Sequence, residues 1–156
     1  MTTFGRHTEC TLQSLGQEAL NAALADAGAS PQDIGQVFYG GVTQGPLQGQ
    51  NAVPGEILVA KLGLRGLPVW NVENACASGT SAFQLSVQAL QAGRCDVALV
   101  IAAEKMNIAD KARALAMFEG GWDVLEGERN AAMLMALGQG LDVPEGSESS
   151  RPYSRF

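Results

Sequence analysis

The stretch NVENACASGTSAFQ, residues 71–84, joins an extended run to a helix and places a cysteine at the junction. Cys76 is expected near the first turn of that helix, where free backbone N–H groups and the positive end of the helix dipole favour a thiolate. Its small neighbours leave room for an acyl group and for close backbone approach: Ala75, Ala77, Ser78 and Gly79. The pattern therefore predicts a nucleophilic cysteine at a strand-to-helix elbow. The competing interpretation is a small buried hydrophobic residue.

On both sides of this elbow, helix and strand patterns alternate along the chain. The spacing of apolar residues predicts helices over 11–27, 51–62, 78–92 and 109–118, a helical turn over 30–33, and strands over 36–39, 67–73 and 96–103. The helix 78–92 carries Phe83, Val87 and Leu90 on one side, and the strand 96–103 is apolar on both faces and is expected to be buried. This order implies parallel strands joined by right-handed crossovers, in an α/β fold with a layered sheet.

The pattern changes after Met106. Residues 118–130 are glycine-rich and acidic, 131–138 are apolar without a clear partner, and 140–156 have the composition of a flexible tail or loop. The chain is therefore divided into 1–106, the α/β part, and 107–156. No strand precedes the first helix and no closing element follows the polar segment, so we expect the chain to be the interior of a larger protein.

Composition narrows the classes of function. The net charge of −6 argues against a nucleic-acid partner, because phosphate binding needs a basic face. The longest apolar runs have seven residues, whereas a membrane-spanning helix needs about 20. No basic-then-apolar leader opens the chain, so we expect a cytoplasmic protein. The only close basic cluster is Lys105, Lys111 and Arg113, which we interpret as a solvated helix face.

The cysteines and the histidine argue against a metal site. Cys10, Cys76 and Cys95 are odd in number and lack metal-ligand spacing, so free thiols in a reducing compartment are expected. His7 is the single histidine, which excludes most histidine-rich metal sites. No cofactor-binding residue can be assigned.

The segment NVENACASGTSAFQLSVQALQAGRCDVALVIAAEKM, residues 71–106, resembles the N-terminal half of the thiolase superfamily. Within the superfamily, it most resembles the lipid-transfer or sterol-carrier type of thiolase, a branch that also includes acetyl-CoA acetyltransferases. The resemblance covers roughly residues 2–130 and includes three further pieces: TTFGRH near the start, LADAG at 24–28 and the Gly40-Gly41 step. Its specific part is the cysteine segment.

The resemblance implies that Cys76 becomes acylated and that its own N–H helps to hold the thioester oxygen. It implies 3-ketoacyl-CoA thiolysis or acetyl-CoA condensation, with coenzyme A thioester as substrate and no cofactor, and a role in fatty acid and lipid metabolism. The family fold is a five-layered sandwich of two similar halves, assembled as dimers or tetramers. Residues 107–156 would then begin the loop domain that covers the substrate.

Three features of the family pattern are missing from these 156 residues. The activating histidine in Gly-His-Pro and the second cysteine in Cys-x-Gly have no counterpart, and neither does the first strand, expected before Thr2. Only Cys76 carries over. We therefore expect a chain without the first strand and the C-terminal half, which a homo-oligomer or a partner subunit would complement.

Three hypotheses remain open at this stage. The first is a thiolase-type acyltransferase present as a fragment. The second is a non-catalytic acyl-CoA-binding or dimerising remnant of the same fold. The third, ranked last, is an unrelated cysteine hydrolase, because no partner histidine stands in a plausible loop.

Overall fold

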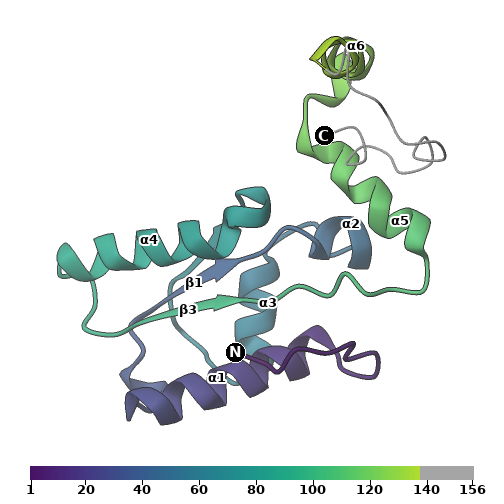
Figure 1. Ribbon diagram of the computed structural model, residues 1–156. Coiled ribbons are helices and arrows are strands. Elements are labelled where there is room, and N and C mark those ends of the chain that lie inside the picture. The colour runs from purple at the N-terminus through teal and green to yellow at the C-terminus, as the bar shows by residue number, and fades with distance from the viewer. Residues whose placement is uncertain (138–156) are drawn as a thin grey trace. The chain divides into compact units, whose positions relative to one another are not determined.

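The computed structural model describes residues 1–137 of the chain (Figure 1). The chain divides into a first unit, Met1–Ile108, and a second unit that begins at Ala109. Each unit is described separately below.

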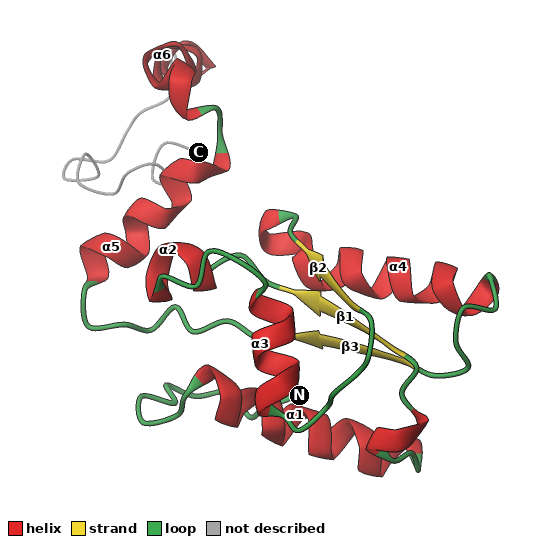
Figure 2. Ribbon diagram, turned by 180° about the vertical axis from the view of Figure 1, so that it is seen from behind, coloured by secondary structure: helices red, strands yellow, loops and turns green. Residues whose placement is uncertain are grey.

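The first unit is built on a parallel sheet with strand order β2-β1-β3. The strands are β1 Gln36–Gly40, β2 Val69–Val72 and β3 Ala98–Ala102. Helix α4, Ser78–Gln91, covers one face, and the helices α1, Leu12–Ala27, and α3, Pro54–Lys61, cover the other (Figures 1 and 2). The predicted α/β fold, with a parallel sheet and helices on both faces, is confirmed.

Local signals explain where the helices begin and end. The Thr11 side chain accepts a hydrogen bond from Ser14 N at the start of α1, and Gly28 ends the helix in the left-handed region with φ 61°. The 3-10 turn Pro31–Asp33 has the predicted proline in its first turn. As predicted from Pro54, α3 begins late in the 51–62 segment.

The core lies between the sheet and the α1/α3 layer. Because side chains alternate along a strand, Val37 and Tyr39 of β1 share this face with Leu99 and Ile101 of β3. The buried helical and loop side chains packed with them are Leu20, Ile34, Leu58, Val59, Leu62 and Leu64. This cluster fixes the strands that lead to the elbow.

The opposite face of the sheet differs from expectation. Side chains of α4 that are buried are small, namely Ser78, Ala82 and Ser86. Phe83 is 58% exposed, Leu90 is 40% exposed and Val87 is half-buried, so the side of α4 that carries them is not its buried side. The prediction that strand 96–103 is buried on both faces is wrong, because in β3 only Leu99 and Ile101 are buried.

Glycine lets α4 approach the sheet closely. A Cβ atom on Gly40, at the end of β1, would lie 2.9 Å from Gly79 Cα and 2.9 Å from Ser78 C. A Cβ atom on Gly79 would in turn lie 3.3 Å from Ala102 Cβ. The first turn of α4 therefore sits against the carboxyl ends of β1 and β3.

The remaining elements are short. In the first unit these are α2, Gln44–Gln48, and the 3-10 helix η2, Ala75–Ala77; in the second they are α5, Lys111–Ala116, the 3-10 helices Met117–Gly121 and Val124–Glu126, and α6, Gly127–Leu137. The apolar run 131–137 lies within α6, whose start in the glycine-rich segment was not predicted. The predicted tail, 140–156, lies outside the described residues. No helix within residues 1–137 is both long enough and apolar enough to cross a membrane.

Candidate functional site

Cys76 lies in the turn between β2 and α4. The 3-10 helix Ala75–Ala77 follows β2 after two residues and runs directly into α4, which has 14 residues. The cysteine side chain is exposed and its thiol is free. This is the carboxyl edge of a parallel sheet, where α/β folds place ligands.

The elbow contains a strained residue immediately before the cysteine. Ala75 has φ +44°, a left-handed conformation that costs a non-glycine residue on the order of 1–3 kcal/mol. Its N–H donates to Glu73 Oε1 at 2.7 Å, and its carbonyl oxygen accepts from Ser78 Oγ, also at 2.7 Å. Ala77 N closes the turn by donating to the Asn74 carbonyl oxygen at 2.9 Å. Both polar groups of the strained residue are thus satisfied by side chains.

Asn74 ties the elbow to the first turn of α4. Its backbone N–H donates to Ser78 Oγ at 2.8 Å, and its side-chain amide donates to Ser81 Oγ at 2.9 Å. Ser78 is 3% exposed, so the hydroxyl that joins Asn74 to Ala75 is buried under the helix. The Ser78 hydroxyl binds backbone groups and the Ser81 hydroxyl binds the Asn74 side chain, so both hydrogen-bond within the elbow.

The backbone N–H of Cys76 remains available. Within the described part of the chain, it has no hydrogen-bond acceptor. It stands at the amino end of α4, where unpaired N–H groups and the helix dipole favour negative charge. A free thiol and a free N–H on the same residue are two of the groups that acyl transfer to a cysteine uses.

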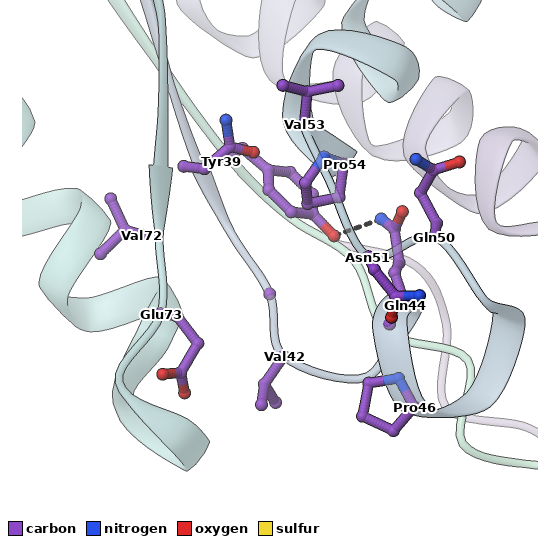
Figure 3. A pocket seen from close by; sticks show the side chains of 13 residues that line it. Tyr39, Val42, Gln44, Pro46, Gln50, Asn51, Val53, Pro54, Val72 and Glu73 are labelled. Atoms are coloured by element: carbon purple, nitrogen blue, oxygen red, sulfur yellow. Dashed lines mark hydrogen bonds between the residues drawn. The ribbon is translucent and has the colours of Figure 1, made fainter.

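A pocket of about 470 Å³ opens beside the elbow, at the carboxyl ends of β1 and β2. Figure 3 shows Val72 and Glu73 on one side of it and Gln44 and Asn51 on the other. No lysine, arginine or histidine is among the described residues that line it. Glu73 is the one charged side chain among these described lining residues, and the others are apolar or carry neutral amide or hydroxyl groups.

Tyr39 forms the floor of this pocket. It is 1% exposed, accepts a hydrogen bond from the Gln44 side-chain amide and donates to the Ala103 carbonyl oxygen at 3.3 Å (Figure 3). Burial, together with the nearby Glu104 charge, raises the pKa of Tyr39 to about 12. Tyr39 is therefore a neutral structural hydroxyl at physiological pH.

Glu104, just after β3, holds the loop that precedes Gln44, the first residue of α2. Its carboxylate accepts from Val42 N at 2.6 Å, from Thr43 N at 3.1 Å, and from the Thr43 hydroxyl. The loop between β1 and α2 is thus tied to the end of β3, which fixes one wall of the pocket.

The other cysteines and His7 are not joined to Cys76 by any hydrogen bond among residues 1–137. Cys10 and Cys95 are half-buried free thiols. His7 Nε2 lies 2.7 Å from the Thr3 carbonyl oxygen and lines a separate pocket of about 300 Å³. No group of three metal-ligating side chains occurs in the described residues.

The expected solvated basic helix face is wrong for Lys105. This residue follows β3 instead of lying on a helix, and its ammonium group donates to the carbonyl oxygens of His7, Thr8 and Cys10. It ties the N-terminal segment to the sheet. Sequence reasoning also missed the pocket, for which the Gly40-Gly41 step and the polar run 43–51 were the available signals.

Comparison with known proteins gives a consistent result. The family model described as the thiolase N-terminal domain matches residues 1–138. An acetyl-CoA acetyltransferase of Methanocaldococcus jannaschii is 31% identical over 140 residues, which are 88% of this chain and 36% of that protein. Chicken sterol carrier protein 2 is 35% identical over 108 residues, 68% of this chain and 19% of that protein.

Two solved structures have similar folds. One is Xanthomonas campestris OleA H285D, with a TM-score of 0.58 and 23% identity over 82% of this chain and 38% of that one. The other is an acetyl-CoA acetyltransferase from Syntrophomonas wolfei, with a TM-score of 0.54 and 28% identity over 68% of this chain and 27% of that one. The chain spans between 19% and 38% of the length of each of these relatives and structures.

Proposed function

The chain belongs to the thiolase family, and from this premise we propose that it carries the acyl-accepting part of a thiolase-type acyltransferase, with Cys76 as the nucleophile. The single observation that carries the proposal is the exposed Cys76 thiol, with its own unpaired N–H, at the amino end of α4. The reaction class is 3-ketoacyl-CoA thiolysis or acetyl-CoA condensation, with the coenzyme A thioester as substrate.

The acylation step uses groups of this chain. The Cys76 thiolate attacks the thioester carbonyl carbon, and the carbonyl oxygen becomes an oxyanion that the Cys76 N–H stabilises. The carbon–sulfur bond to coenzyme A then breaks, and the coenzyme A thiolate leaves and takes up a proton. The product is an acyl group on Cys76 Sγ.

The pocket beside the elbow supports an uncharged acyl group as the part transferred. Its volume of about 470 Å³ lies within the usual range for small-molecule sites. Apolar side chains, including Val53 and Val72, alternate in its wall with amides such as Asn51. Glu73 lines the pocket and also accepts the hydrogen bond from Ala75 N, so the pocket lies next to the elbow, although Cys76 is not among its lining residues.

Turnover needs more than acylation. Thiolysis and condensation require a base and an acid within hydrogen-bond reach of the acyl carbon, and each such step contributes about 10²–10⁴-fold. The sequence contains no Gly-His-Pro and no Cys-x-Gly segment. We therefore expect these 156 residues alone to take up one acyl group without multiple turnover. The acid and the base would have to come from residues outside this sequence, as in a different partner subunit.

Intact mass spectrometry tests the proposal. The chain is incubated with acetyl-CoA or acetoacetyl-CoA, and one added acyl group located on Cys76 by peptide mapping is the expected result. Cys76→Ala should abolish it, and Cys95→Ala, a matched loss of a free thiol, should not. Thioester binding without acylation would overturn the proposal and favour a non-catalytic acyl-CoA-binding module of the same fold.

A further inference from the structure

We infer that Glu73 is a positioning residue for acyl transfer at Cys76, because its carboxylate holds the elbow in the conformation that leaves the Cys76 N–H free. The inference rests on the proposed function. It assigns a role to the residue that follows β2, which would otherwise be an exposed acidic side chain in a loop.

The geometry singles out Glu73. Its Oε1 accepts from the Ala75 N–H at 2.7 Å, the length of a charge-assisted hydrogen bond. On the other side of the same residue, Ser78 Oγ donates to the Ala75 carbonyl oxygen at 2.7 Å. Both the N–H and the carbonyl oxygen of Ala75 are therefore hydrogen-bonded to side chains. These two bonds stabilise the unfavourable left-handed conformation of Ala75, with φ +44°.

The Cys76 amide is the next peptide unit along the chain. Its N–H direction depends on the ψ angle of Ala75, so relaxation of Ala75 would turn it away from the side on which the thiol is exposed. The buried Ser78 hydroxyl holds this same peptide unit at the Ala75 carbonyl oxygen, and Glu73 holds the preceding one at the Ala75 N–H. Removing the Glu73 carboxylate frees Ala75 to leave positive φ, and this rotation would break the Ser78 contact and change the direction of the Cys76 N–H.

Two reactions of the same thiol separate this role from a general effect on structure. Acylation by a thioester forms an oxyanion and needs the Cys76 N–H in place. Alkylation by iodoacetamide displaces iodide from a saturated carbon, forms no oxyanion, and depends on the thiolate and on access. A positioning residue for the N–H affects the first reaction and spares the second.

The experiment compares the rates of Cys76 acylation by acetyl-CoA and of Cys76 alkylation by iodoacetamide in one set of variants of this chain. Loss of one oxyanion donor costs about 10²–10³-fold, and its displacement should cost less, so we expect Glu73→Ala to slow acylation by about 10–100-fold. Alkylation should stay close to wild type. Glu73→Gln keeps an acceptor oxygen and should retain most of the acylation rate. Glu18→Ala, which removes an exposed glutamate from α1, is the matched control.

A second variant distinguishes a local change at Ala75 from a general folding defect. Glycine adopts positive φ without steric cost, so Ala75→Gly added to Glu73→Ala should restore part of the lost acylation rate. Equal acylation in wild type and Glu73→Ala, or a parallel loss of alkylation, would overturn the inference and leave the proposed function standing. A wild-type chain that is never acylated would overturn the proposed function and this inference with it.

Discussion

Replacing Gly40 by alanine is expected to displace the first turn of α4 and the elbow it carries. The new Cβ would lie 2.9 Å from Gly79 Cα, whereas carbon atoms pack best at about 3.5–4.0 Å. The obstacle is backbone on both sides, so the helix must move away by roughly 0.6–1.1 Å, the difference between these distances. Overpacking of this kind costs about 1–3 kcal/mol. A misplacement near 1 Å can also slow a positioned reaction by about 10²-fold.

Urea unfolding and the rate of Cys76 acylation measure the two effects separately. Gly28→Ala is the control for a stability loss without a clash, because Gly28, unlike Gly40, has positive φ and nothing lies within 4 Å of its added Cβ. That variant should lose about 1–2 kcal/mol from backbone strain and keep its acylation rate. If Gly40→Ala loses neither stability nor acylation rate, the close contact between β1 and α4 does not position the elbow, and the reasoning is refuted.

Two further predictions follow from exposure and charge. In the folded protein, limiting iodoacetamide should label Cys76 faster than the half-buried Cys95, as measured by peptide mass spectrometry; equal labelling would argue against an accessible elbow thiol. The pKa of Tyr39, raised by burial to about 12, predicts a stability contribution that is complete below the unfolded-state pKa near 10 and is lost as the pH rises from 10 to 12. Between pH 10 and 12, the unfolding free energy measured in urea should fall by about 2–3 kcal/mol more in wild type than in Tyr39→Phe. The same dependence of unfolding free energy on pH in both proteins would contradict this prediction.

The sequence was sufficient for the parts of the fold that local patterns control. Alternation and helical spacing placed the three strands and the helices α1, α3 and α4, and the Pro54 signal placed a helix start. The pocket was not predictable in this way, because its walls are fixed by contacts distant in sequence. Glu104, for example, accepts a hydrogen bond from the hydroxyl of Thr43, which lies 61 residues away in the sequence, and no local pattern predicts that contact.

The elbow itself illustrates a second limit. Small residues around Cys76 indicated room for a substrate, but they do not reveal which side chain holds the turn. Glu73 precedes the cysteine by three residues, and its contact with Ala75 depends on a backbone conformation that alanine rarely adopts. No residue pattern in the sequence predicts that backbone conformation, so the contact between Glu73 and Ala75 could be found only in the structure.

The buried face of α4 could not be predicted from hydrophobic spacing, for a reason that bears on function. Hydrophobic spacing locates large apolar side chains, and it assumes that these face the sheet. Where two backbones meet as closely as Gly40 and Gly79, no large side chain fits between them, so Ser78 and Ala82 are buried and Phe83 is turned outward. The same close contact brings the buried Ser78 hydroxyl under the turn, where it bonds Ala75. The small residues that break the apolar pattern are therefore the ones that fix the position of Cys76.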